Sequence, residues 1–181
     1  VLQGKARGIF EDRNVVLTCG ETAMFRLASQ IPNGAVLGGR GPHGVFAPDN
    51  ALNRWFREAY TERYGTPPTY PSYKMVQAIL GLKAATEKAA GGKPGQPSEE
   101  AVIAAFEGLS FETPSGTVDM KLGKGHQAVQ STAYGRFKLD PATGQPTMTD
   151  VTTYAAECVN PPDGVKSEDW IKGGFKGAKC P

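Results

Sequence analysis

The chain has 181 residues, enough to bury a hydrophobic core in one ordinary domain or in parts of two small lobes. Its 20 Lys and Arg residues nearly balance its 18 Asp and Glu residues, and the formal net charge is +2. This balance gives no electrostatic case for binding nucleic acid or an anionic membrane surface. No apolar run approaches the roughly 18 residues that a membrane-spanning helix requires.

The first residues, "VLQGKARGIFEDRN", contain no initiator Met and no visible signal peptide, and they resemble the tail of a helix. We therefore expect the chain to start inside a longer protein. Residues 15–18 predict a short buried strand, and apolar residues at helical spacing follow over residues 21–31. Residues 35–39 and 44–47 predict two further short strands, separated by a glycine-rich turn.

Three helices are predicted next. Asn50 is expected to cap a helix that ends at Gly65, and apolar residues form a stripe on one of its faces. The stripe consists of Leu52, Trp55, Phe56, Ala59 and Tyr60. A second helix runs from the prolines near Tyr70 to Gly91, and Ser98 caps a third. We expect the aromatic rings of Tyr60, Tyr64 and Tyr73 to lie in the core.

The remainder of the chain is rich in extended segments, at residues 111–122, 127–139 and 147–156. Strands alternate with helices in the first part of the chain and dominate the last part. This order predicts an α/β protein.

No motif in the sequence supports catalysis. Gly39, Gly41 and Gly44 have the spacing of a dinucleotide-binding loop, but an extended segment follows instead of the helix that receives the pyrophosphate. No Gly-x-Ser-x-Gly elbow occurs. Cys19 could pair with His43 or His126 as a thiol nucleophile, but nothing local supports this. His126 lies in a glycine-rich turn, where we expect it to form a structural hydrogen bond or to occupy a solvated loop position. We predict a protein that is not an enzyme and needs no cofactor.

The three cysteines form no Cys-x-x-Cys pair and lie far in sequence from the two histidines, so a metal site is not expected. Cys158 and Cys180 bracket a segment rich in proline and glycine. A disulfide between them would close this loop, stabilise it by about 3 kcal/mol and indicate an oxidising compartment. The alternative is two unpaired thiols in a cytosolic tail.

Glu21 lies at the start of a helix, directly after a predicted strand. Ligands of open α/β sheets bind at such strand ends, where a carboxylate can hold a ligand ammonium group. The alternative is a glutamate that stabilises only the first turn of its own helix.

The stretch from Asn53 to Arg136 resembles the later half of the type I periplasmic binding proteins, most closely the branched-chain amino acid receptors of ABC importers. The resemblance depends on the order of "NRWFREAYTERYGTPP", "YPSYKMVQAILGLKAATEKAAG" and "AVIAAFEGLSFETPSGTVDMKLGKGHQAVQSTAYGRFK". The tail "CVNPPDGVKSEDWIKGGFKGAKC" is similar to the C-termini of one bacterial subgroup. Lys74 departs from the family, which usually has Asp at that position.

The resemblance implies two lobes, each of three α/β/α layers, that close over a ligand. Residues 1–47 would end the second lobe, residues 48–110 would return to the first, and residues 111–181 would contain the strands that cross the hinge and the C-terminal tail. The N-terminal half of the fold would be absent. That half normally supplies the Ser, Thr and backbone groups that hold the ligand carboxylate.

The resemblance also implies the ligand-binding residues. Glu21 matches the acidic position that meets the ligand ammonium, with Thr22 next to it. Thr69 and Tyr70 fall near the aromatic position that flanks the ligand side chain. These four residues are the binding candidates.

The resemblance implies a periplasmic solute-binding protein, whose signal peptide has been removed. It would carry an amino acid, or an aromatic or aliphatic carboxylate, to the permease subunits of an ABC importer. The alternative is a sensory ligand-binding domain on the same fold. A receptor ectodomain should continue into a membrane-spanning helix, whereas this chain ends at Gly-Ala-Lys-Cys-Pro, so transport is favoured.

Overall fold

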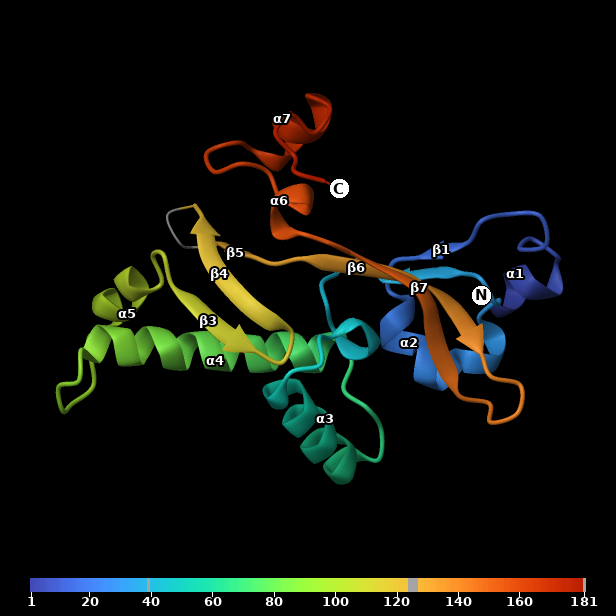
Figure 1. The fold of residues 1–181 in the computed structure, drawn as a ribbon, viewed down its shortest axis with the longest axis horizontal. Helices are drawn as coiled ribbons and strands as arrows, with labels where there is room; N and C mark the ends of the chain where they lie inside the picture. The colour runs from blue at the N-terminus through green and yellow to red at the C-terminus, as the bar shows by residue number, and fades with distance from the viewer. Residues whose placement is uncertain (39, 124–126, 181) are drawn as a thin grey trace.

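The structure is a computed structural model, and it describes residues 1–38, 40–123 and 127–180. The molecule is elongated, with a four-stranded sheet toward one end and a three-stranded sheet beside a long helix toward the other (Figure 1). The helices are α1 (Leu2–Ala6), α2 (Gly20–Leu27), α3 (Ala51–Tyr64), α4 (Tyr70–Ala90), α5 (Glu99–Ala105), α6 (Ala156–Val159) and α7 (Ser167–Lys172), with the 3₁₀ turns η1 (Ala28–Gln30) and η2 (Gly44–Phe46). The strands are β1 (Val16–Leu17), β2 (Val36–Gly38), β3 (Ser110–Thr113), β4 (Gly116–Leu122), β5 (Gln127–Val129), β6 (Thr132–Leu139) and β7 (Pro146–Tyr154).

The four-stranded sheet has the order β1-β2-β6-β7. Strands β1 and β2 are parallel, whereas β6 runs antiparallel to both β2 and β7. In the β2–β6 pair, Val36 lies opposite Arg136 and Gly38 lies opposite Tyr134. The late strands of the chain therefore complete a sheet that its first strands begin.

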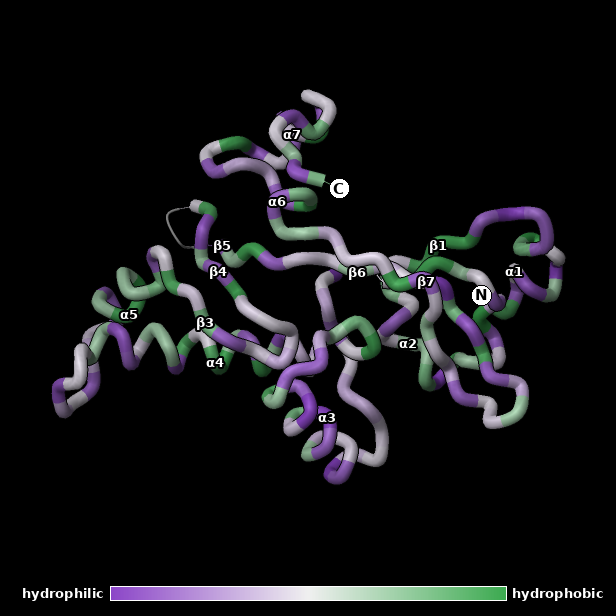
Figure 2. Tube along the Cα trace, in the orientation of Figure 1, coloured by the Kyte–Doolittle hydropathy of each residue, from purple (hydrophilic) through white to green (hydrophobic). Residues whose placement is uncertain are grey.

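The core of this sheet is apolar and is covered by α2. It consists of Met24, Ile31, Ala35, Leu37, Phe46, Ala133 and Phe137. Fully burying side chains such as Leu37 or Phe137 stabilises the fold by about 1.5–3 kcal/mol each. Figure 2 shows the hydrophobic colouring of β1 and β2 and the hydrophilic colouring that dominates α3.

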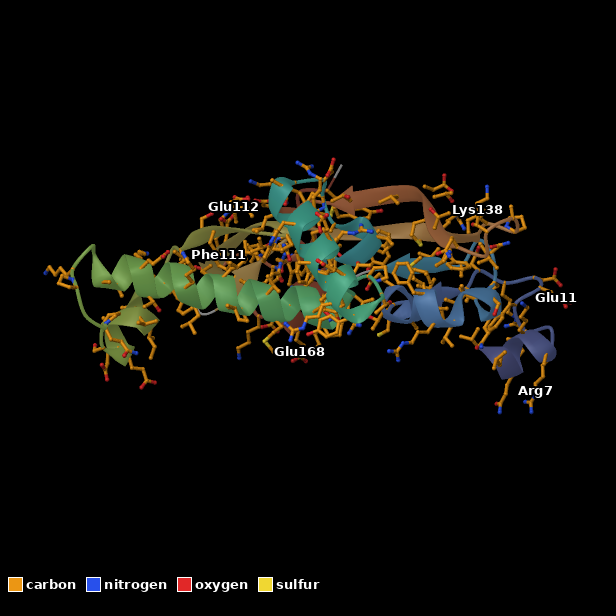
Figure 3. All side chains as sticks on the ribbon, turned by 90° about the horizontal axis from the view of Figure 1, so that it is seen from below. Arg7, Glu11, Phe111, Glu112, Lys138 and Glu168 are labelled. Atoms are coloured by element: carbon orange, nitrogen blue, oxygen red, sulfur yellow. A yellow bond between two sulfur atoms is a disulfide. The ribbon has the colours of Figure 1, made fainter. Side chains whose placement is uncertain are left out.

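The three-stranded sheet, in the order β3-β4-β5, packs on α4. Phe111 of β3 lies against α4, where a Cβ atom on Gly81 would be only 2.8 Å from the phenyl ring. Figure 3 shows Phe111 beside α4 and Glu112 farther from it, as the alternation of side chains along a strand requires. The absence of a side chain at Gly81 thus allows the sheet to approach the helix closely.

The capping signals of the sequence are confirmed. The Asn50 side chain accepts a hydrogen bond from Asn53 N at 2.7 Å and so caps α3, and Gly65 ends this helix with a φ of 68°. Ser98 caps α5 in the same way, with its hydroxyl oxygen 3.3 Å from Ala101 N. These ends were predictable because each depends on residues close in sequence.

The predicted strand at residues 44–47 is wrong. Gly44 has a φ of +57°, and Phe46 N donates to His43 O at 3.0 Å, so the chain turns into η2 there. Two side chains expected in the core are also exposed, Trp55 at 60% and Tyr64 at 58%. On α3 the buried positions are Asn53 and Phe56, so the face that packs is narrower than the apolar stripe.

Two segments that were each predicted as one extended piece are divided into two strands in the structure. Residues 111–122 form the β3–β4 hairpin, which turns at Pro114 and Ser115. Residues 127–139 divide into β5 and β6, which belong to different sheets. Gln130 and Ser131 lie between the two strands, and they include no proline or glycine that would have signalled this change of sheet.

The C-terminal tail is closed by a disulfide between Cys158 and Cys180, which confirms the predicted pair and excludes two free thiols. Inside the loop, Trp170 packs edge-on against Phe175, with ring centroids 5.1 Å apart. Within the three described ranges, no helix is long and apolar enough to cross a bilayer.

Candidate functional site

Glu21 lies in the first turn of α2, immediately beyond the end of β1, and is only 6% exposed. Its Oε2 accepts a hydrogen bond from Tyr70 N at 3.3 Å, at the start of α4. The carboxylate thus lies at the N-terminus of a second helix, where a negative charge is favoured. Burial raises the pKa of Glu21, while the Tyr70 N–H and the charge of Arg40 lower it to a smaller extent.

The second carboxylate oxygen of Glu21, Oε1, is buried and has no hydrogen-bond partner among the described residues. It lies over Gly44, and a Cβ atom at that position would overlap it. The turn at Gly44 therefore provides the space that the carboxylate occupies. A buried acceptor without a partner is costly, and such atoms are uncommon in folded proteins.

His43 is 2% exposed and directly precedes Gly44 in this turn. Its Nδ1 is 2.9 Å from Ser115 Oγ in the β3–β4 turn, whereas its Nε2 is buried without a partner among the described residues. The imidazole meets the Tyr70 ring edge-on, with centroids 5.3 Å apart. Burial lowers the pKa of His43 to about 4, and the charge of Lys74 contributes to this shift.

Arg40 covers the site from the solvent side. Its guanidinium carbon lies 3.8 Å from the centroid of the Tyr70 ring, and its Nη2 donates to Thr22 Oγ1 at 3.2 Å. A guanidinium stacked on an aromatic face in this way is a cation–π contact. Arg40 and Tyr70 together close the outer side of the space that contains Glu21.

The enclosed space has a volume of about 10 Å³, the lower limit for a single water molecule. Its lining consists of Thr18, Glu21, Thr22, Gly38, Arg40, Gly41, His43, Phe46 and Tyr70. Polar groups from three separate segments of the chain thus converge on one small hollow. In the arrangement observed, an amino acid has no room inside it.

The structure brings together three of the four predicted binding residues, namely Glu21, Thr22 and Tyr70. Thr69 precedes α4 and does not line the hollow. Arg40, His43 and Gly44 were not predicted as site residues. The only sequence signal for them was the glycine-rich turn. It resembled a nucleotide-binding loop, but it did not predict which side chains would lie in the site.

The remaining sequence candidates lie elsewhere. Cys19 is an exposed free thiol whose sulfur is 3.9 Å from Thr18 Oγ1, and it has no hydrogen bond to His43. Gly39 and His126 lie outside the described residues. Within the part of the chain that the structure describes, no three His, Cys, Asp or Glu side chains are grouped to hold a metal ion.

Comparison with solved structures shows a shared fold. A branched-chain amino acid ABC transporter protein from Rhodopseudomonas palustris is 26% identical, with a TM-score of 0.62, over 81% of this chain and 36% of that one. A solute-binding protein from the same species, in complex with 3,4-dihydroxybenzoic acid, has 20% identity and a TM-score of 0.66, over 85% and 40%. A leucine-, isoleucine-, valine-, threonine- and alanine-binding protein from Brucella ovis has 19% identity and a TM-score of 0.66, over 90% and 42%.

The chain spans 36–42% of the length of these three structures. No curated protein matches it. Residues 5–145, most of the chain, match the model of the family described as periplasmic binding protein. This match and the shared fold show that the chain belongs to the periplasmic binding protein family.

Proposed function

We propose that the chain is part of an extracytoplasmic solute-binding protein of an ABC importer. It binds a small amino acid or a related carboxylate in a cleft between two lobes. The observation that carries this proposal is the buried carboxylate of Glu21, which lies beyond the end of β1. Its Oε1 has no hydrogen-bond partner among the described residues. An ammonium group of the ligand would provide the missing donor and the opposite charge.

The ligand reaches Glu21 when Arg40 and Tyr70 move apart. The present hollow of about 10 Å³ admits no amino acid, and Arg40 is exposed and held by one hydrogen bond and one stacking contact. Movement of Arg40 costs little because both of its contacts are near solvent. Binding then favours whichever arrangement gives the ligand the better contacts.

The arrangement of the two sheets supports the proposed division into lobes. Residues 1–47 end the second lobe, and residues 48–110 belong to the first, which contains α3 and α4. Residues 111–181 then cross the hinge, because β3 packs on α4 whereas β6 pairs with β2. Closure is a hinge motion between these two bodies.

The proposed location is the periplasm, and the proposed partners are the permease subunits of the importer. The Cys158–Cys180 disulfide supports this location, because such bonds persist in oxidising compartments. The solved neighbours from R. palustris and B. ovis are described as a transporter protein and an amino acid-binding protein, which agrees with an import role.

Isothermal titration calorimetry of the full-length protein that contains this chain, with amino acids and with benzoate-type acids, tests the proposal. At least one ligand should bind with a Kd that depends on Glu21. Glu21→Gln should weaken binding of an ammonium-bearing ligand by on the order of 2 kcal/mol, about 30-fold in Kd.

The matched control is Glu99→Gln, which removes an exposed first-turn carboxylate from α5 and should leave the Kd unchanged. Failure of every carboxylate ligand to bind would refute the proposal. Equal affinity of the Glu21→Gln variant and the wild-type protein would assign Glu21 to the capping of α4 alone.

A further inference from the structure

A second hollow lies beside the Glu21 site and is much larger, with a volume of about 360 Å³. It opens where α4 and the residues after β2 meet the start of β6 and the end of α6. Its lining includes two cations, Arg40 and Lys74, and no carboxylate. Its volume is in the range of pockets that bind small molecules.

Neither cation forms an ion pair within 4 Å among the described residues. Lys74 is half-buried on α4, one turn after Tyr70, and burial lowers its pKa. Tyr70 and Lys74 lie one turn apart on the same face of α4. The guanidinium of Arg40 stacks on the Tyr70 ring, and this contact holds its positive charge near the hollow. The two charges also lower the pKa of the buried His43, so the field in this region is positive.

Hydroxyl groups supply the other donors of the hollow. Thr132 Oγ1 accepts a hydrogen bond from Gly41 N at 3.3 Å, which leaves its hydroxyl hydrogen free to donate. Ser131 and Tyr134 also line the space. By contrast, the Gln130 amide already bonds Ser115 O and the Gln77 side chain. The Asn160 amide nitrogen is likewise engaged, with Gln130 O and Ala156 O. The donors that remain for an anion are therefore the hydroxyl groups.

We propose that Arg40 and Lys74 form a subsite that binds the carboxylate group of a small organic acid. An anion there gives both cations an ion-pair partner and accepts hydrogen bonds from the neighbouring hydroxyls. This inference extends the proposed function, since Arg40 separates the subsite from Glu21. The carboxylate belongs either to the ligand held by Glu21 or to an acid that binds independently.

The test follows Lys74 by NMR in the 181-residue chain labelled with ¹³C at the lysine side chains. Succinate is the probe, because both of its carboxylates are ionised at the alkaline pH where lysine titrates. The pKa of Lys74 should rise on addition of succinate at constant ionic strength, whereas that of the exposed Lys83 should stay constant. Succinamide, which has the same shape without charge, should have no effect.

Affinity gives a second readout. Lys74→Gln and Arg40→Gln should each weaken succinate binding at least tenfold in calorimetry. Lys83→Gln is the matched control, since it removes one lysine from the exposed face of the same helix and should leave binding unchanged. An unshifted Lys74 pKa, or equal succinate binding by the Lys74→Gln and Lys83→Gln variants, would overturn the proposal.

Glu21→Gln separates this subsite from the proposed function. Succinate should bind this variant as it binds the wild-type chain, because it has no ammonium group. If L-glutamate, measured by calorimetry at neutral pH where its ammonium group is charged, binds more tightly than succinate only while Glu21 is intact, one ligand occupies both sites. If Glu21→Gln changes neither titration, the acid binds independently, and the subsite stands even where the Glu21 proposal fails.

Discussion

At the scale of single residues, the site depends on a glycine that provides space for a carboxylate. Gly44 lies in the left-handed region with a φ of +57°, and any side chain there would overlap Glu21 Oε1. Gly44→Ala should therefore lower the free energy of unfolding by more than the ~1–2 kcal/mol that the backbone conformation alone costs. Urea denaturation measures this loss.

Gly65→Ala is a matched control, because Gly65 has a φ of +68° and nothing lies within 4 Å of a Cβ atom there. It should lose only the backbone contribution. Equal losses in the two variants would mean that Glu21 moves aside without cost, and that the contact with Gly44 does not position the carboxylate.

His43 makes stability depend on pH. Its pKa is about 4 in the folded chain against 6.5 for an ordinary histidine, because burial and the charge of Lys74 disfavour the imidazolium. Between these values the unfolded chain binds more protons, so the free energy of unfolding should decrease as the pH falls from 6.5 toward 4. The loss amounts to up to ~3 kcal/mol.

His43→Asn removes this titration while keeping an amide nitrogen near the position of Nδ1. Urea midpoints measured from pH 4 to pH 7 should therefore show that the wild-type protein loses more stability than the variant as the pH falls. Parallel curves would show that His43 titrates normally. The charges of Lys74 and Arg40 act on the same imidazole and remain in both proteins, so their contributions cancel in the comparison.

Sequence reasoning at this scale placed Glu21 correctly at the start of α2, but it did not predict the surroundings of this residue. A carboxylate directly after a strand is a local pattern, so its position was predictable. Its partner, the Tyr70 N–H, is 49 residues away, and His43 bonds Ser115 across 72 residues. No local pattern reports such contacts, because they exist only after the elements pack.

At the scale of elements, one buried hydrogen bond joins α3 to α4. The Tyr73 hydroxyl donates to Asn53 Oδ1 at 2.7 Å, and Tyr73 is fully buried. Tyr73→Phe should destabilise the protein by about 1–3 kcal/mol, because it leaves the buried Asn53 oxygen without this donor. Thermal or urea unfolding measures the change.

Tyr60→Phe provides the comparison. Its hydroxyl accepts a bond from Ser72 Oγ at 3.0 Å in a half-buried position, where water can replace it. This variant should lose less stability than Tyr73→Phe. A larger loss for Tyr60→Phe would mean that the half-buried Tyr60–Ser72 bond contributes more to the connection between α3 and α4 than the buried Tyr73–Asn53 bond.

Helices were easier to predict than strands because their ends carry side-chain caps. Asn50, Gly65 and Ser98 marked α3 and α5 correctly. The strand prediction for residues 44–47 was wrong because an apolar Val-Phe-Ala run is compatible with both a strand and a 3₁₀ turn. The positive φ of Gly44 decides between the two, and a glycine adopts this angle without the overlap that a side chain would make with Glu21.

At the scale of the whole molecule, the disulfide holds the C-terminal tail. Apart from the contacts of α6, the tail is a loop with one short helix, and its closure by Cys158 and Cys180 contributes about 3 kcal/mol. Reduction should expose Lys166 and Lys172 to trypsin well before Lys138 in β6. Mass spectrometry of timed digests measures the order of cleavage.

Cys19→Ser should leave this order unchanged, since Cys19 is the free cysteine. Simultaneous cleavage in the tail and in β6 after reduction would contradict the expectation, because it would mean that the sheet unfolds together with the tail. The pair itself was predictable from the composition of the loop, whereas the packing of Trp170 on Phe175 within it was not.

The pairing of β2 with β6 has a consequence for synthesis. Arg136 donates to Gly34 O across 102 residues of chain, and α3, α4 and the other sheet all lie between them. Strands β1 and β2 are therefore translated long before β6, and β2 has no β6 partner until most of this chain has been made. Contacts between distant residues slow folding, and unpaired strand edges are prone to aggregation. The edge of β2 is thus the segment that a chaperone would most usefully cover during synthesis.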